Sequence, residues 1–179
     1  MELRRASLEE RRKTYEWSLN IVSEDKCSGW PEGPKQSYAE FSADFEDFFY
    51  MENGRRKGGV MIIEEAGEEI GCVCYTCFHL KKGAAELDIW LRDVKYCNHG
   101  YGAQAIALMI EYLKNELGVS RFIIRPKAEN KRAIRAYEKA GFRLSDDPTA
   151  VIAEFLIPEY IQVYGDEEER DKETALLIL

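Results

Sequence analysis

A strand that runs into a glycine-containing loop and then into a helix is the feature that most limits the fold of this 179-residue chain. Alternating apolar residues predict a strand over 85–92, and Gly100 and Gly102 then open a helix that runs to Leu117. Glycines at a helix start let a ligand approach the backbone closely. The unpaired N–H groups and the positive end of the helix dipole attract an anion. The segment therefore predicts an anion site suited to a pyrophosphate.

The same glycine pair also fits a simple tight turn. The third glycine of a dinucleotide fingerprint is missing, and so is the lysine that follows the glycines of a P-loop. The loop alone therefore does not identify the ligand.

Periodicity elsewhere predicts an α/β chain in which antiparallel strands come first and alternating strands and helices follow. The predicted strands cover 2–6, 60–64, 70–78, 85–92, 121–125 and 151–157. The predicted helices cover 7–20, 38–50, 100–117 and 130–141. This order predicts one sheet with helices on both faces.

Composition limits the partners and the location of the chain. The net charge of −8 argues against nucleic acid, whose phosphates need a basic surface. Apolar runs stay well short of the roughly 20 residues that a membrane-spanning helix needs. The charged start, Met1 to Arg5, has no apolar segment behind it that would indicate a signal peptide. We therefore expect a cytoplasmic protein that acts on neither membranes nor nucleic acid.

Three cysteines and a histidine, at positions 72, 74, 77 and 79, raise the question of a metal site. A strand sends Cys72 and Cys74 to one face and Cys77 to the other, so the three thiols do not converge. A second cysteine pair, which a structural zinc site would need, does not follow. We predict buried thiols and no metal.

A second motif follows the glycine loop after one predicted helix and one predicted strand. Asn130, Arg132-Ala133, Tyr137 and Gly141-Phe142 stand in the spacing that is the hallmark of the GNAT acetyltransferases, and the glycine loop resembles their pyrophosphate motif. Cys97 occupies the position where that motif prefers Gln or Arg. The resemblance covers roughly residues 60–145 and extends to the N-terminal third in element order.

The resemblance implies a GNAT fold, which is a central mixed, mostly antiparallel, twisted sheet of six to seven strands with a splay between strands 4 and 5. It implies a single domain over 1–179, with 1–58 on the substrate side, 59–145 as the acetyl-CoA-binding core and 146–179 as a final strand and tail. It also implies that acetyl-CoA is the cofactor and lies in the splay. The residues that the resemblance assigns to acetyl-CoA are Trp90, Leu91, Arg92, Cys97, Asn98, His99, Gly100, Tyr101, Gly102, Ala103, Asn130, Ala133 and Tyr137.

Acetyl transfer to an amine needs a base, because a free alkylammonium has a pKa of about 10. Strand alternation puts Glu86 and Asp88 on one face, away from Leu87 and Ile89. We expect one of these two acids to be the base. Asp88 is preferred because its strand resembles the corresponding strand of aminoglycoside 6′-N-acetyltransferases. Tyr137 is the candidate that protonates or hydrogen-bonds the leaving thiolate, since full transfer from a phenol is uphill by about 2 kcal/mol in water.

The acceptor is less closely defined by the sequence. Trp30 and Tyr38 flank a loop and are candidates to line its pocket, together with Asp88 and Arg125. Arg125-Pro126 stands where the aminoglycoside enzymes often have Asp-Pro, and a cation there is expected to repel a polycationic drug.

Three functions therefore stay open. The chain could acetylate a small cationic amine, such as an aminoglycoside, or a peptide or protein N-terminus. It could also be a non-catalytic module that senses acetyl-CoA. The apolar segment 175–179 docks either on the sheet or on a partner subunit of a homodimer.

Overall fold

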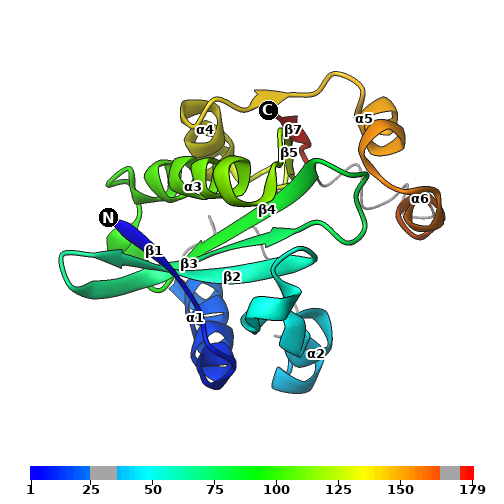
Figure 1. The fold of residues 1–179 in the computed structure, drawn as a ribbon. Helices are drawn as coiled ribbons and strands as arrows, with labels where there is room; N and C mark the ends of the chain where they lie inside the picture. Colours follow the sequence, from blue (N-terminus) through cyan, green and yellow to red (C-terminus); the bar gives the residue numbers. More distant parts are fainter. Residues whose placement is uncertain (25–35, 166–173) are drawn as a thin grey trace.

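A mixed seven-stranded sheet forms the centre of the computed structural model, which describes residues 1–24, 36–165 and 174–179 (Figure 1). The strands lie in the order β1-β2-β3-β4-β5-β7-β6. In the described part of the chain β4 and β5 are parallel, and the other neighbouring pairs are antiparallel. The bounds are β1 (Glu2–Arg5), β2 (Gly58–Glu65), β3 (Glu68–Thr76), β4 (Ala84–Leu91), β5 (Arg121–Ile124), β6 (Arg143–Leu144) and β7 (Leu177–Ile178). The predicted mixed, mostly antiparallel sheet is confirmed.

Helices cover both faces of the sheet, as predicted (Figure 1). One face carries α1 (Arg11–Glu24) and α2 (Tyr38–Asp44), and the other carries α3 (Tyr101–Tyr112) and α4 (Lys131–Lys139). A further pair, α5 (Pro148–Phe155) and α6 (Pro158–Gly165), packs beside the β5 end of the sheet. No helix in the described ranges has both the length and the apolar character that crossing a bilayer requires.

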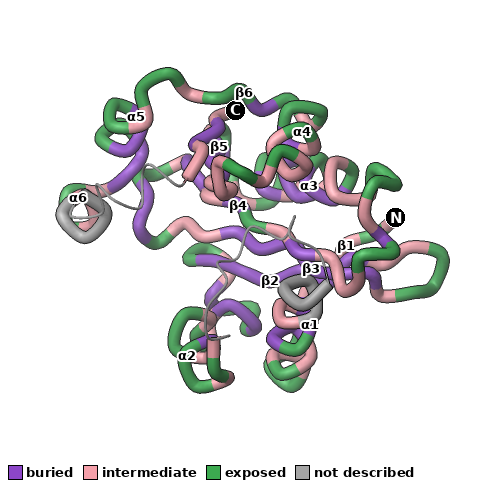
Figure 2. The backbone as a smooth tube through the Cα atoms, turned by 180° about the vertical axis from the view of Figure 1, so that it is seen from behind, coloured by how far each residue is buried: buried purple, intermediate pink, exposed green. Residues whose placement is uncertain are grey.

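Strand alternation divides the core into two layers, and the mostly buried strands β2 and β3 lie between them in Figure 2. On β4, Leu87 is buried in the layer under α3 and α4, whereas Trp90 is buried in the layer over α1 and α2. Cys72 and Cys74 lie in the second layer and Cys77 packs against the first, as the alternation predicts. Both faces of β4 are therefore covered at Leu87 and Trp90, whereas Asp88 stays exposed.

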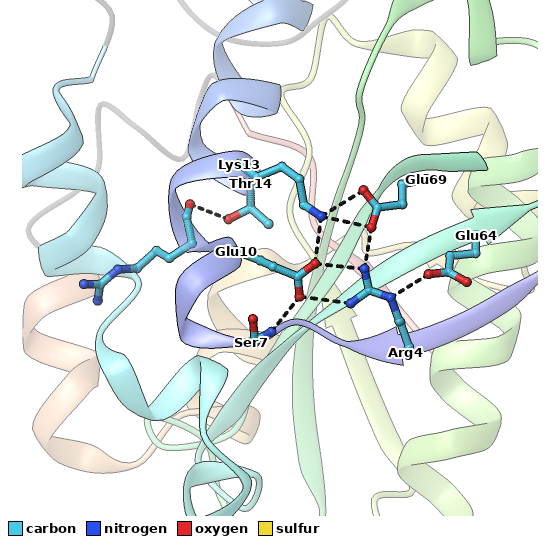
Figure 3. A network of polar contacts seen from close by, with 8 residues as sticks. Arg4, Ser7, Glu10, Lys13, Thr14, Glu64 and Glu69 are labelled. Atoms are coloured by element: carbon cyan, nitrogen blue, oxygen red, sulfur yellow. Dashed lines mark hydrogen bonds and ion pairs between the residues drawn. The ribbon is translucent and has the colours of Figure 1, made fainter. Parts of the chain in front are cut away.

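Polar contacts fasten α1 to the sheet at its N-terminal end (Figure 3). A capping box is present at its start: the Ser7 amide donates to the Glu10 carboxylate at 2.9 Å. Glu10 also accepts from Arg4 of β1, and Lys13 joins Glu10 to Glu69 of β3. Further along α1, the Thr14 carbonyl accepts a hydrogen bond from the indole N–H of Trp90 on β4, at 3.2 Å. These contacts fix the start of α1 relative to β4.

The predicted strand over 151–157 is wrong, because Pro148–Phe155 forms α5. Asp147 caps this helix through a bond from the Ala150 amide to its carboxylate at 3.0 Å, and Pro148 occupies the first turn. Val151, Ile152 and Phe155 are all buried, in a spacing of one helical face. A short apolar run fits a buried strand and a buried helix equally well. Here Asp147 and Pro148, which precede the run, favour the helix.

The predicted helix over 38–50 is shorter than expected. It ends at Asp44, and a separate 3₁₀ turn covers Asp47–Tyr50. Phe45 leaves the helical conformation at φ −104° and ψ 70°, and it stacks on Phe41 with ring centroids 4.6 Å apart. Phe41 and Phe45 both pack against Trp90 on the sheet, although only Phe41 lies within the helix.

The C-terminal tail docks on the sheet of its own chain, which was one of the two predicted outcomes. Leu177–Ile178 forms β7 between β5 and β6. The Leu179 amide and carbonyl both bond to Phe122, at 2.9 and 2.8 Å.

Candidate active site

The parallel strands β4 and β5 separate after a short stretch of pairing. Their last paired residues are Leu87 and Ile124. Two positions later Pro126 has no N–H to donate, so β5 cannot continue the ladder. The two strands then diverge around a cleft of about 690 Å³. The predicted splay is therefore present between the fourth and fifth strands.

Most of the residues predicted to bind the cofactor line this cleft. They are Trp90, Leu91, Cys97, Asn98, Gly100, Tyr101, Gly102, Ala103, Asn130, Ala133 and Tyr137. Asp88 and Arg125, which were predicted to meet the acceptor, line it as well. The structure thus brings the two sequence motifs and the strand acid to one place.

Four of the predicted site residues that the structure describes do not line the cleft. The Arg92 guanidinium bonds the Tyr96 hydroxyl, and its amide donates to the Ile70 carbonyl at 2.8 Å, so neither group faces the splay. His99 is exposed and stacks on Tyr101, with 5.6 Å between ring centroids. Glu86 and Tyr38 lie outside the lining.

Tyr38 begins α2, and its side chain lies against α1. Its ring packs on Tyr15, and the Arg12 guanidinium lies 4.6 Å from its centroid. Tyr38 therefore does not line the cleft, and its part in an acceptor pocket stays a prediction. Trp30, the other predicted pocket residue, lies outside the described residues.

The N-terminus of α3 opens into the cleft. Gly100 caps the helix at φ 86°, a left-handed conformation that favours glycine. The amides of Tyr101, Gly102 and Ala103 have no partner within the helix, because they belong to its first turn. Gly102 has ordinary helical geometry, and a Cβ there would have no protein atom within 4 Å. The lack of a side chain at Gly102 therefore keeps space open in front of the amides.

The edge of β4 beyond the paired stretch also faces the cleft. Because the Arg92 amide points to β3, the alternation of a strand turns the Leu91 amide toward β5. The Ile89 amide, which points the same way, donates to the Asp88 carboxylate at 2.8 Å. Because the Ile89 amide bonds the Asp88 carboxylate, the Leu91 amide is the next one along β4 that is directed into the splay.

Asp88 combines an open position with a poorly hydrated carboxylate. Its side chain is exposed to the cleft, yet the surrounding protein removes much of its hydration and raises its pKa to about 6. The Ile89 amide and Arg125 oppose this shift, and the charge of Glu86 adds to it. A carboxyl with this pKa is ionised at neutral pH and is basic enough to accept a proton.

Tyr137 of α4 lines the same cleft and is 6% exposed. Burial raises the pKa of its phenol, and the charge of Asp88 raises it further, while Arg132 lowers it. Among the described residues we find no hydrogen-bond partner for its hydroxyl. Tyr137 is therefore a protonated donor that a bound ligand could engage.

Glu86 and Arg125 form a paired unit at the point where the strands separate. The Arg125 Nε and Nη2 donate to the two carboxylate oxygens of Glu86 at 2.7 and 3.1 Å. His79 Nε2 lies 2.8 Å from the same carboxylate, and the histidine is 2% exposed. Burial opposes ionisation of Glu86, but Arg125 and His79 outweigh it and keep its pKa below the ordinary value.

Several lining residues were missed in the sequence. Arg132, Arg135 and Lys139 line the cleft from α4. Their spacing of three and four residues on a predicted helix was a usable signal for one cationic face. Ser18 of α1 and Lys127 also line the cleft, and their positions depend on how distant segments pack, which no local pattern predicts.

Comparison with known proteins places this site in a family. The chain matches the acetyltransferase (GNAT) domain over residues 1–143. A kanamycin resistance protein of Rhizobium radiobacter is 35% identical over 60 residues, which are 34% of this chain and 56% of that protein, so the match spans little more than half of the relative.

Solved structures share the fold at low identity. The aminoglycoside acetyltransferase AAC(6′)-Ib, in complex with coenzyme A and kanamycin, has a TM-score of 0.67 at 19% identity and covers 99% of this chain and 92% of its own. Spermidine N-acetyltransferase from Vibrio cholerae, with CoA and spermine, has a TM-score of 0.67 at 16% identity and covers 99% and 94%. The ribosomal L7/L12 alpha-N-protein acetyltransferase RimL, with CoA, has a TM-score of 0.66 at 12% identity and covers 99% and 92%. With the domain match over most of its length, this chain belongs to the GNAT acetyltransferase family.

Proposed function

We propose that this chain transfers the acetyl group of acetyl-CoA to an amine of a small cationic molecule, with Asp88 as the base. The observation that carries the proposal is that Asp88 and Tyr137 line one cleft together with the first turn of α3. Membership of the GNAT family supports the reaction class, and several structural relatives were solved with CoA or acetyl-CoA.

The cleft has the groups that acetyl-CoA needs. The first-turn amides of α3 suit a pyrophosphate, and Gly102 leaves space for it. Arg132, Arg135 and Lys139 add positive charge for the phosphate of CoA that is not part of the pyrophosphate. When bound, acetyl-CoA supplies the thioester, and the Leu91 amide is placed to stabilise negative charge that develops on the thioester oxygen.

Asp88 removes the proton of the amine. An alkylammonium with a pKa of about 10 does not readily give its proton to a carboxylate. The first proton of the ammonium is therefore lost to solvent, which frees the lone pair that attacks the thioester carbon. As the new C–N bond forms, the nitrogen becomes positively charged, and one of its remaining protons becomes far more acidic. A carboxylate with a pKa of about 6 then accepts that proton more readily than an ordinary aspartate would.

Tyr137 stabilises the departing sulfur. A phenol donates to a thiolate at a cost of about 2 kcal/mol in water, and burial of Tyr137 makes loss of its proton harder still. We therefore assign it a hydrogen bond to the sulfur, with the phenol keeping its proton while solvent protonates the CoA thiolate that leaves.

The charge of the acceptor side favours a cationic substrate. Glu86 offsets the charge of Arg125, so the repulsion expected from Arg125 is largely cancelled. Asp88, which belongs to no ion pair among the described residues, then adds a negative charge to the cleft beside this pair. A small amine with more than one positive charge, of the kind found with the aminoglycoside and spermidine enzymes, fits this balance.

A thiol-release screen tests the proposal. The wild-type protein with acetyl-CoA would be assayed against aminoglycosides, polyamines and peptides with free N-termini. We expect turnover with at least one cationic small amine. Turnover with peptides alone would move the assignment to N-terminal acetylation, and tight acetyl-CoA binding without turnover on any amine would indicate a sensor.

A further inference from the structure

Glu86, which faces the same way as Asp88 on β4, is already engaged in hydrogen bonds with other side chains of the protein. Both carboxylate oxygens of Glu86 accept hydrogen bonds from Arg125, and one of them also contacts His79. Glu86 is 17% exposed, against 19% for Arg125, and it does not line the cleft. An amine in the cleft therefore has no direct path to this carboxylate.

The position of the pair in the sheet suggests what it does. The ladder between β4 and β5 ends with Leu87 opposite Ile124. Glu86 lies one residue before that end on β4, and Arg125 lies one residue beyond it on β5. The bidentate contact thus crosses the two strands where they begin to separate.

We propose that Glu86 is a positioning residue. Together with Arg125 and His79 it forms a clamp that sets the separation of β4 and β5 next to Asp88. We call these three residues the vertex clamp. This inference rests on the proposed function, because it assigns Glu86 a part in that reaction other than proton transfer.

His79 is the buried anchor of the vertex clamp. It follows β3 and is enclosed by aromatic rings: Phe78 lies at 5.3 Å and Tyr160 of α6 at 6.0 Å between centroids. The Ile157 amide donates to the His79 carbonyl at 3.1 Å, which ties the segment between α5 and α6 to the same point. Because an ionised carboxylate only accepts, His79 Nε2 carries the proton in this contact. The rotamer of Glu86 is therefore fixed from two sides.

The vertex clamp also affects the charge on Asp88. The titratable or charged groups that face Asp88 are Glu86 on its own strand, Cys72 and Cys74 on β3, Arg125 after β5 and Tyr137 on α4. Glu86 makes ionisation of Asp88 harder, and Arg125 makes it easier. Substitutions of the two clamp partners should therefore move the acidic limb of the kcat/KM profile in opposite directions.

The test compares Glu86→Gln with Arg125→Gln in the full-length protein. Removing the negative charge of Glu86 lowers the pKa of Asp88, so the acidic limb should move to lower pH. Removing the positive charge of Arg125 should move the limb to higher pH. We expect each variant to keep kcat within about tenfold of wild type, since the base is intact. Arg121→Gln is the matched control, because Arg121 lies on the same strand in an exposed ion pair with Glu154.

Two results would overturn the vertex clamp. One is a loss of kcat in Glu86→Gln as large as that in Asp88→Asn, with no acidic limb remaining, which would make Glu86 the base. The other is a shift of the acidic limb in the same direction in Glu86→Gln and Arg125→Gln. That result would leave the two residues with a structural role only. His79→Gln, which keeps a donor, should preserve kcat better than His79→Leu.

A measurement without turnover separates this inference from the proposed function. The imidazole N–H of His79, bonded to Glu86, should give a slowly exchanging proton resonance that is absent from His79→Gln. We expect it to persist in Asp88→Asn and to disappear in Glu86→Leu. An unchanged resonance in Glu86→Leu contradicts the vertex clamp, whereas the wild type failing to turn over any amine contradicts only the proposed function.

Discussion

Tyr137 of α4 and Asp88 of β4 line one cleft, and the charge of Asp88 adds to burial in raising the pKa of the Tyr137 phenol. The pKa of Asp88 itself is raised to about 6. Between that value and the higher pKa of the phenol, the carboxylate is ionised while the phenol keeps its proton. One site then offers a proton acceptor and a hydrogen-bond donor over the whole neutral pH range.

The pH dependence of the wild type follows from this pairing. Asp88 must be ionised to accept a proton, so kcat/KM calculated for the neutral form of the amine should rise with pH up to about 6 and level off above it. Below that point it should fall about tenfold per pH unit. The measurement is a kcat/KM profile with an amine whose own titration is known. A profile without a limb in this range would remove Asp88 from the role of base.

Tyr137→Phe removes the donor and keeps the ring that packs in the core. We expect kcat to fall by about 10- to 100-fold, as for a positioned donor in a dry site, and acetyl-CoA affinity to change little. Tyr112→Phe is the control, because Tyr112 packs near Tyr75, away from the cleft. Equal kcat values for Tyr137→Phe and wild type would show that the hydroxyl takes no part.

Gly102→Ala should affect stability and binding in opposite ways. Alanine favours a helix over glycine by about 0.5–1 kcal/mol, and the new Cβ meets no protein atom, so Tm should be unchanged or higher. The same methyl group occupies space in front of the α3 amides and should weaken acetyl-CoA binding about tenfold or more. Gln104→Ala, at an exposed position on the same helix, is the control. Calorimetric affinities equal to wild type would show that the cofactor does not approach this turn.

The cations of α4 should contribute to binding through charge. Arg135→Gln with Lys139→Gln should weaken CoA binding by about 1 kcal/mol, or roughly fivefold, at low salt. The loss should shrink as salt is added and should be smaller for dephospho-CoA, which lacks the terminal phosphate. Lys131→Gln, exposed on the same helix but outside the cleft, should bind like wild type. A loss in the double variant that does not depend on salt would contradict the electrostatic account.

Local sequence signals predicted the parts of the fold that depend on short-range chemistry. Gly100 and Asn130 both begin helices where expected, and the Asn130 side chain accepts from the Ala133 amide at 3.0 Å. The alternation of β4 placed Asp88 and Trp90 opposite Leu87, as the structure has them. These features follow from capping geometry and strand period, which a few neighbouring residues determine.

Other features depended on partners far away in the chain. The ion pair between Glu86 and Arg125 spans 39 positions, so strand alternation alone left Glu86 as a candidate base. Tyr38 packs on Tyr15 of α1 and does not line the cleft, and this depends on how α1 and α2 pack together. Phe155 lies in α5, and the apolar run around it is too short for its periodicity to distinguish a helix from a strand.

The central claim is that Asp88 is the base, and the rate of a single turnover tests it most directly. Asp88→Asn keeps the oxygen that accepts from the Ile89 amide. It also removes a charge whose ionisation the fold disfavours, so Tm at pH 8 should not fall. With acetyl-CoA and an accepted amine both saturating, we predict that acetyl transfer in Asp88→Asn is at least about 100-fold slower than in wild type, while acetyl-CoA binds equally well. A transfer rate in Asp88→Asn close to that of the wild type would contradict the account.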